Sequence, residues 1–459
     1  MFASDEKLAA QTTDPAWAWA AYQPDAERPW TLRLAGHLFR RAAFGADAVQ
    51  LAAALADGPQ KTIDRLLWPG DVAAFDRAQD AYEATAVGPE TGSADAVRDW
   101  WLRRMILTPH PLAERMAFFW HDYFAASNLR VNNALLMQKH VALLRRHALG
   151  SFGELLLAVC RDAAMIVSAE GEERPSPRPN DRLARHLLAR LTVGPGQFSD
   201  DDVRAAGRAL AGRFVVGRRF HEAPPPDGAS PQGFLGLQVA AEGDAVVRAA
   251  LAHPATPRTV VARLYRWLIS ETAPPSEALV APLAESLAKD FDTARLVETM
   301  LRSNLFFSPA AYRQRIKGPV DFAVGLVRAL GQLIPTAPLG DDLAALGQSL
   351  CYPPSGAGWP GGQAWINPFT LLGRSNLAAA LLAEGGRYAG KLDPLAVAAK
   401  HDRTATAQQF FLDLLLQDDL ADEVRQKLLA PLRSAPVNLP QAGRQFVRAV
   451  ATLPEFQLS

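Results

Sequence analysis

The amino-acid sequence predicts an all-α protein: a multi-helical globular array with long irregular loops and little or no sheet. Apolar residues recur at the three- and four-residue spacing of amphipathic helices through much of the 459-residue chain. Prolines and glycines separate these periodic segments and are expected to end the helices. No apolar run approaches the roughly 18 residues that a membrane span requires, so we expect a soluble protein without a membrane partner.

In chain order, we expect five parts. An irregular N-terminal strap covers 1–30, a helical region with the central motifs covers 31–221, and a linker loop covers 222–236. A second helical region with a Trp-Pro-Gly-Gly loop covers 237–390, and a C-terminal helical cap covers 391–459. The strap is too apolar for a free tail, because it carries Trp17, Trp19 and Trp30. The linker sequence EAPPPDGASPQGFLG combines proline with glycine and lacks periodicity.

The first helices are indicated by their end signals. From Thr31 the pattern is helical up to Gly45, a residue that suits a C-terminal cap, and Arg40 and Arg41 suit the last turn. A second helix, 46–55, is expected to end at Gly58-Pro59.

The helix predicted over 112–127 opens the central stretch. Its broad apolar stripe includes Phe119, Trp120 and Tyr123, whereas His121 falls nearly opposite the centre of that stripe. The helix is therefore expected to be buried on most sides. His121 is either a hydrogen-bonded core histidine or a site histidine in a polar cleft.

The next helix, 135–149, carries His140 and His147. Seven residues separate them, about 10.5 Å along a helix axis, which is too far for both to bind one metal ion. Surface or groove positions are expected for both. The sequence has no HExxH or CxxC pattern, so it predicts neither a metal site nor a cofactor.

Charge and cysteine content narrow the class of protein. Lys plus Arg and Asp plus Glu both number 48, so no overall field attracts nucleic acid, which we do not expect as a partner. Cys160 and Cys351 are expected to be buried free thiols in a reducing compartment. The N-terminus carries acids and a proline where an export signal needs a positive flank, which predicts a cytoplasmic protein.

Several motifs resemble, in order and spacing, the bacterial domain of unknown function 1800. They are HLFRRAAFG at 37–45, FWHDYF at 119–124, Pro179-Asn180, Thr192-Val193-Gly194, Pro353-Pro354 and GWPGG at 358–362. The resemblance covers about residues 32–380. It implies a mostly helical fold in a family without an established activity. It also implies a possible partner, because family members often lie beside a gene for an exported protein similar to alkaline phosphatases and sulfatases.

The chain departs from that family pattern at carboxylates. The resemblance implies an Asp-Asn pair where Glu170 and Gly171 stand, and three glutamates where Asp181, His186 and Ala189 stand. In the helix predicted over 181–191, leucines form the buried side. The other side carries Arg182, Arg185, His186 and Arg190, so it is basic where relatives are acidic. This indicates a degenerate site, although the relatives' glutamates could also be structural ion-pair partners.

The segment Gly356-Ala357-Gly358-Trp359-Pro360-Gly361 matches the pattern GxGxxG, but two prolines precede it and no βαβ unit surrounds it. Nucleotide binding is therefore not expected. The glycines are predicted to allow a tight turn, while Trp359 and Trp365 anchor the loop to the helices and Arg374 hydrogen-bonds it.

Two functional hypotheses follow. The first is a non-catalytic scaffold or accessory protein that binds another protein, the co-encoded phosphatase-like or sulfatase-like one being a candidate. The second is a hydrolase for an anionic substrate, with His121, Glu170, Asp181 and His186 as catalytic candidates and Arg185, Arg374 and Trp359 as substrate-binding candidates. The enzyme hypothesis gains if those four side chains share one pocket. It loses if they are scattered or sealed by Trp359.

Overall fold

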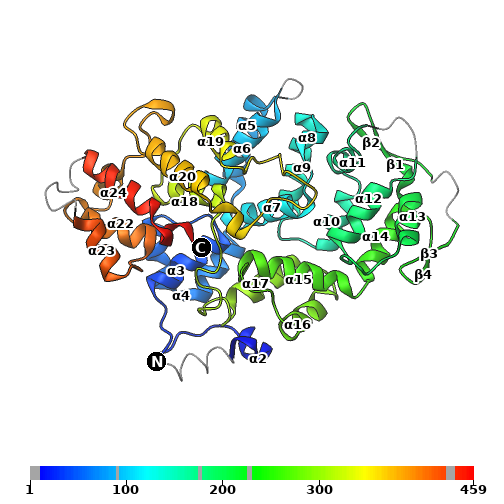
Figure 1. Cartoon of the computed structure of the whole chain (residues 1–459), viewed down its shortest axis with the longest axis horizontal. Helices are drawn as coiled ribbons and strands as arrows, with labels where there is room; N and C mark the ends of the chain where they lie inside the picture. The colour runs from blue at the N-terminus through cyan, green and yellow to red at the C-terminus, as the bar shows by residue number, and fades with distance from the viewer. Residues whose placement is uncertain (1–10, 89–91, 174–177, 225–229, 431–439) are drawn as a thin grey trace.

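The computed structural model describes residues 11–88, 92–173, 178–224, 230–430 and 440–459. The predicted all-α class is confirmed, since helices dominate and the described strands form two two-stranded antiparallel sheets (Figure 1). No helix in these ranges combines the length and the apolar character that a bilayer crossing demands.

The N-terminal segment packs along the body of the protein. Its described part includes the short helix α2 (Pro15–Ala18), and two of its tryptophans are hydrogen-bonded to distant segments. Trp19 Nε1 donates to Leu279 O at 2.9 Å, and Trp30 Nε1 donates to Ala54 O at 2.9 Å. These bonds explain why a segment rich in tryptophan stays close to the core.

The helices up to the central motif form the middle of the molecule (Figure 1). They are α3 (Leu32–Ala42), α4 (Ala48–Leu67), α5 (Ala73–Ala86), α6 (Ala94–Leu107) and α7 (Pro111–Phe124). Within α4, Gly58 has a φ of 78°, which kinks the helix at the predicted Gly-Pro stop.

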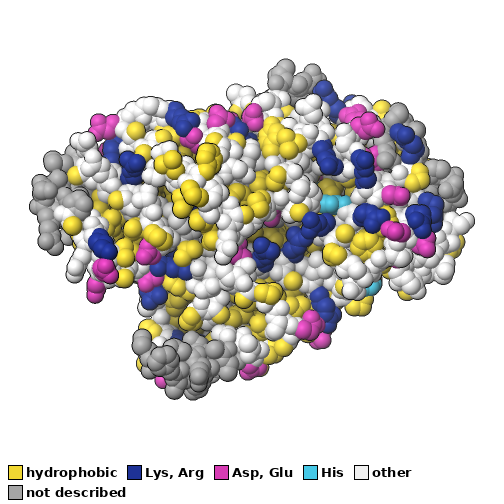
Figure 2. Space-filling model, in the orientation of Figure 1, with side chains coloured by type: hydrophobic (Ala, Val, Ile, Leu, Met, Phe, Trp, Pro, Cys, Tyr) yellow, Lys and Arg dark blue, Asp and Glu magenta, His cyan; other side chains and the backbone are white. Residues whose placement is uncertain are grey.

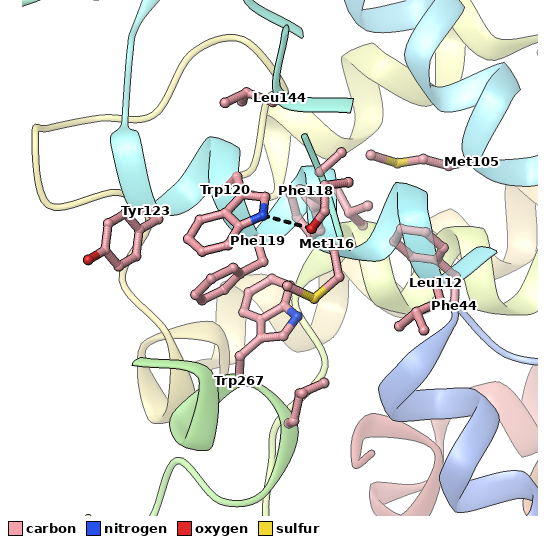
Figure 3. Packing of buried hydrophobic residues seen from close by; sticks show 14 of the residues in the cluster. Phe44, Met105, Leu112, Met116, Phe118, Phe119, Trp120, Tyr123, Leu144 and Trp267 are labelled. Atoms are coloured by element: carbon pink, nitrogen blue, oxygen red, sulfur yellow. Dashed lines mark hydrogen bonds between the residues drawn. The ribbon is translucent and has the colours of Figure 1, made fainter. Parts of the chain in front are cut away.

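Helix α7 is the centre of the core. All of its residues except Ala113 and Asp122 are buried, as expected for a helix whose apolar side chains point in most directions. Trp120 stacks on Phe152 at 5.5 Å between ring centroids, and its Nε1 donates to Ala148 O at 3.0 Å (Figure 3). Phe118 and Phe119 both pack against Trp267, each at 5.5 Å.

The following elements gather on one side of α7 (Figure 1). The helices are α8 (Asn128–Val131), α9 (Ala134–Arg146), α10 (Phe152–Val159), α11 (Ala163–Glu170), α12 (Asp181–His186), α13 (Asp200–Ala209) and α14 (Gly243–Ala252). The strands are β1 (Arg213–Val216) with β2 (Arg219–Glu222), and β3 (Gln232–Phe234) with β4 (Leu237–Val239). The segment predicted as an irregular linker thus includes β3, while 225–229 lie outside the described residues.

The remaining helices complete the body and the C-terminal part. They are α15 (Ala255–Leu268), α16 (Glu277–Leu287), α17 (Thr293–Arg302), α18 (Pro319–Ala329), α19 (Thr336–Ala345), α20 (Pro368–Leu381), α21 (Pro394–Lys400), α22 (Ala407–Leu416), α23 (Asp422–Leu429) and α24 (Pro440–Thr452). The last residues return to the core, where Lys317 N donates to Gln457 O at 2.8 Å.

Candidate functional site

A pocket of about 640 Å³ opens beside the C-terminal end of α7. Its walls come from α7, α8, α11, α12 and the loop before Trp359. The residues that line it are Phe124, Ala125, Ser127, Leu129, Arg130, Met165, Ser168, Ala169, Asp181, Arg182, Arg185, His186, Ala189, Arg190, Pro353, Pro354, Ser355 and Gly356. Figure 2 shows basic side chains and a histidine gathered on the face that carries α8 and α12.

Helix α12 supplies the basic wall. Asn180 begins it, because its side chain accepts a hydrogen bond from Leu183 N at 3.0 Å. The leucine side of the segment is buried as predicted, and Arg182, Arg185 and Arg190 are exposed on the other side. After His186 the chain continues as one π-helical turn, Leu187–Leu191, a distortion that recurs at functional sites.

The arginines of the pocket are held chiefly by neutral groups. Arg130 Nη1 donates to Ser168 O at 3.2 Å, and Arg182 Nη1 donates to Glu170 O at 3.0 Å. Arg185 pairs with Asp200 at 2.8 Å on the open surface. Across the described residues, Arg130, Arg182 and Arg190 form no ion pair within 4.0 Å, and Asp181 is the one carboxylate lining the pocket. The site therefore carries excess positive charge.

His186 is a neutral imidazole at the back of this wall. Its Nε2 lies 3.2 Å from Phe124 O, so Nε2 donates and Nδ1 keeps its lone pair. Burial, together with neighbouring arginines, lowers the pKa of His186 to about 4. Asp181, the other catalytic candidate in the pocket, stands exposed at the first position of α12.

His121 and Glu170 are not among the lining residues. His121 is fully buried, with Trp101 and Trp359 each 5.4 Å from its ring centroid. Its Nε2 accepts a hydrogen bond from Cys351 N at 3.1 Å, and burial holds the pKa of His121 well below its usual value. Glu170 is buried as the last residue of α11. The structure thus brings two of the four catalytic candidates together in the pocket.

Of the three substrate-binding candidates, Arg185 lines the pocket, whereas Arg374 and Trp359 do not. Arg374 is 1% exposed and donates to Lys317 O at 2.7 Å, to Gln457 Oε1 at 2.9 Å and to Trp365 O at 3.4 Å. The last bond agrees with the predicted tie to the Trp-Pro-Gly-Gly loop. Trp359 is also buried, between Phe118 and His121.

The loop from Cys351 to Trp359 forms a wall of the pocket and is fixed at both ends. His121 accepts a hydrogen bond from Cys351 N, and Asp122 Oδ1 accepts one from Trp359 N at 2.7 Å. Burial raises the pKa of Asp122 to about 6. Two adjacent residues of α7 therefore hold the two ends of the loop.

Gly358 has a φ of 79°, and a Cβ atom there would collide with Asp122 Oδ1. Only a glycine leaves room for this approach between the loop and α7.

The sequence interpretation missed or misplaced two residues. Arg130 lies on the four-residue helix α8, which is too short for a periodic signal. His140 was expected at the surface or in a groove, and this is wrong. It is fully buried, and its Nδ1 lies 2.6 Å from Asp162 Oδ2, so the carboxylate compensates for burying the ring. In the described ranges no group of three or more His, Cys, Asp or Glu side chains is arranged to hold a metal ion.

Comparison with known proteins places these motifs in a family. No curated protein and no solved structure matches the chain. The family model described as "Protein of unknown function (DUF1800)" matches residues 37–458, beyond the 32–380 expected from the motifs and through the C-terminal helices. Because this match covers nearly the whole chain, the protein belongs to the DUF1800 family.

Proposed function

We propose that this protein is a non-catalytic accessory protein that binds an anionic ligand in the basic pocket beside α12. The observation that carries the proposal is the composition of the pocket. Four arginines line it, against a single carboxylate among its described lining residues. Guanidinium groups bind carboxylates, phosphates and sulfates through paired N–H donors, and a low local negative charge leaves these donors available.

The chemistry of the lining also argues against acid-base catalysis. A hydrolase of this kind needs a general acid and a general base within hydrogen-bond reach of the substrate. His121 is sealed below Trp359, Glu170 lies outside the lining, and His186 already donates to Phe124 O. Asp181 is then the one carboxylate among the described lining residues, and the free Nδ1 of His186 is a weak base because the pKa of the ring is lowered to about 4.

The apolar part of the lining defines the ligand further. Phe124, Leu129, Met165 and the prolines 353 and 354 share the pocket with the arginines. A free inorganic anion would leave these side chains uncovered. A ligand with an anionic group next to an apolar body uses both kinds of surface.

Calorimetric titration at low salt, with phenyl phosphate as the probe and phenol as the uncharged comparison, tests this function. We expect phenyl phosphate to bind and phenol not to bind measurably. Replacing Arg182 and Arg190 with glutamine should weaken binding at least about tenfold, because a hydrogen bond to a charged group contributes about 1.5–3 kcal/mol. Arg204→Gln is the matched control, since Arg204 is an exposed arginine of α13 outside the lining.

Three results would contradict the proposal. Unchanged binding by the Arg182/Arg190 double variant, or no binding by the native protein, removes the pocket as the anion site. If the native protein releases phenol from phenyl phosphate and Asp181→Asn abolishes this release, the protein is a hydrolase instead.

A partner protein could present the anionic group. We propose that the co-encoded phosphatase-like or sulfatase-like protein suggested by the family resemblance is that partner. Co-purification of the two products from the native host tests this, with the Arg182/Arg190 double variant expected to lose the complex. An intact complex with that variant would place the contact outside the pocket.

A further inference from the structure

A second, much smaller cavity lies among residues of α3, α18 and α22 and shares no lining residue with the basic pocket. Its volume is about 30 Å³, which suffices for one or two water molecules or a single monatomic ion. Three polar side chains face it from separate segments: Arg40 of α3, Lys317 just before α18, and Gln417 at the end of α22. Apolar residues complete the lining, among them Phe44, Leu51, Leu414 and Phe456.

One of the side chains that line the cavity, Arg40, has donors that lack an acceptor of normal hydrogen-bond geometry. Arg40 is 9% exposed, and its Nη1 donates to Gln417 Oε1. Its Nε and Nη2 are buried and make no hydrogen bond of normal geometry to a described residue, although the Tyr312 ring lies beside the guanidinium, with its centroid 5.7 Å from Cζ. Lys317 is 5% exposed, and its Nζ lies 3.8 Å from the centroid of the Phe456 ring. Buried donors without acceptors are costly and rare in native proteins.

The charges around the cavity are also unbalanced. Besides burial, the guanidinium groups of Arg40, Arg374 and Arg313 lower the pKa of Lys317 well below its usual value, while Asp321 acts in the opposite direction. Asp321 is already engaged by Arg115, which donates to its Oδ1, and by Arg315 at 3.7 Å.

Asp419, the other carboxylate near Arg40, is shared as well. It pairs with Arg33 at 3.3 Å and with Arg313 at 3.0 Å, and it accepts a hydrogen bond from Tyr312 Oη. Neither described carboxylate is thus free to neutralise both Arg40 and Lys317.

We propose that this cavity binds one chloride ion between the Arg40 guanidinium and the Lys317 ammonium. Chloride accepts N–H hydrogen bonds, carries the missing negative charge and is small enough for the space. A volume of about 30 Å³ suits a monatomic anion better than phosphate, sulfate or a carboxylate. With chloride bound, Lys317 is held in its charged form and the free donors of Arg40 gain an acceptor.

Thermal unfolding of the full-length protein in sodium chloride and in sodium gluconate at equal ionic strength tests the proposal. We expect a melting temperature about 1–2 °C higher in chloride at a tenfold excess over the dissociation constant, from the linkage of binding to folding. Lys317→Met keeps the length of the side chain and should abolish this difference. Arg190→Gln alters the basic pocket only and should keep it.

A crystal grown with bromide gives a second measurement that does not depend on the stability of a variant. An anomalous peak between Arg40 and Lys317 supports the proposal. Equal melting temperatures of the native protein in the two salts, or a cavity that holds only water in the bromide crystal, overturns it. Failure of phenyl phosphate to bind the basic pocket would leave this site unaffected.

Discussion

The carboxyl group of Asp122 joins α7 to the pocket loop by accepting the hydrogen bond from Trp359 N. Burial destabilises the charged form of this group. Its pKa of about 6 in the folded protein exceeds the value of 3.8 of a free side chain. The stability it contributes is therefore complete below pH 3.8 and lost as the pH rises through 6. An asparagine at this position would keep an oxygen to accept from Trp359 N without this loss.

We therefore expect Asp122→Asn to become more stable than the native protein as the pH rises from 4 to 7, by up to about 3 kcal/mol. Urea unfolding of both proteins across this range measures the difference. A constant difference at every pH would mean that the folded and unfolded carboxyl groups bind protons alike.

His186 has the opposite linkage. Its pKa of about 4 lies below the ordinary 6.5, so its contribution to stability is complete above pH 6.5 and falls away as the pH drops towards 4. A bound anion favours the protonated ring. We predict that benzenesulfonate, whose charge is constant here, binds more tightly as the pH falls from 7 to 5, and that His186→Gln binds it with an affinity independent of pH. Calorimetric titration at several pH values checks this.

At the scale of elements, the pocket depends on how α12 is begun. Asn180→Ala removes the hydrogen bond to Leu183 N and should cost about 1 kcal/mol of stability. It should also weaken phenyl phosphate binding, because Arg182 lies in the turn that loses its cap and Arg185 follows directly after that turn. Ser276→Ala, at the cap of α16, is expected to destabilise the fold without altering binding. If Asn180→Ala and Ser276→Ala changed phenyl phosphate binding equally, the cap of α12 would have no specific role in forming the pocket.

The packing of α13 against α12 is a second feature at this scale. A Cβ atom on Gly207 would collide with Asp181 Oδ1 and come within 3.2 Å of Asp181 N. Gly207→Ala should therefore destabilise the protein by about 1–3 kcal/mol, as overpacking does. Gly153→Ala in α10, where a Cβ makes no contact closer than 3.5 Å, should be neutral or stabilising. Chemical denaturation of the two variants compares them.

At the scale of the whole molecule, the C-terminal residues close the core around α18. Phe456 packs edge-on against Phe322 at 5.6 Å, and Ile316 and Leu458 form an antiparallel bridge. We expect Phe456→Ala to cost about 3–5 kcal/mol. Tryptophan fluorescence, to which the buried Trp100, Trp101 and Trp120 contribute, should show this loss in the same transition as far-UV circular dichroism. Separate transitions would mean that the C-terminal part folds independently.

The sequence predicted the helices well because burial on one side leaves a period of three to four residues. The segment 181–191 is an example, since its leucines are buried and its arginines exposed on the two sides that the helical period predicts. The pocket was harder to predict, because its walls come from segments far apart in the chain. His121 follows an aromatic run and His186 lies among arginines, but neither pattern indicates that Trp359 covers His121 while His186 stays beside the pocket.

The strand β3 was not predicted, because the proline-rich sequence before it favours an irregular linker. The hydrogen-bond partner of His140 could not be recognised from the spacing of residues in the sequence. Both depend on contacts between residues that periodicity does not relate.

The attachment of both ends of the loop 351–359 to neighbouring residues of α7 has a consequence for ligand selection. A wall held at both ends cannot open as a flap hinged at one end. Adjustment to bulkier ligands then falls to the rotamers of the exposed lining arginines Arg182, Arg185 and Arg190.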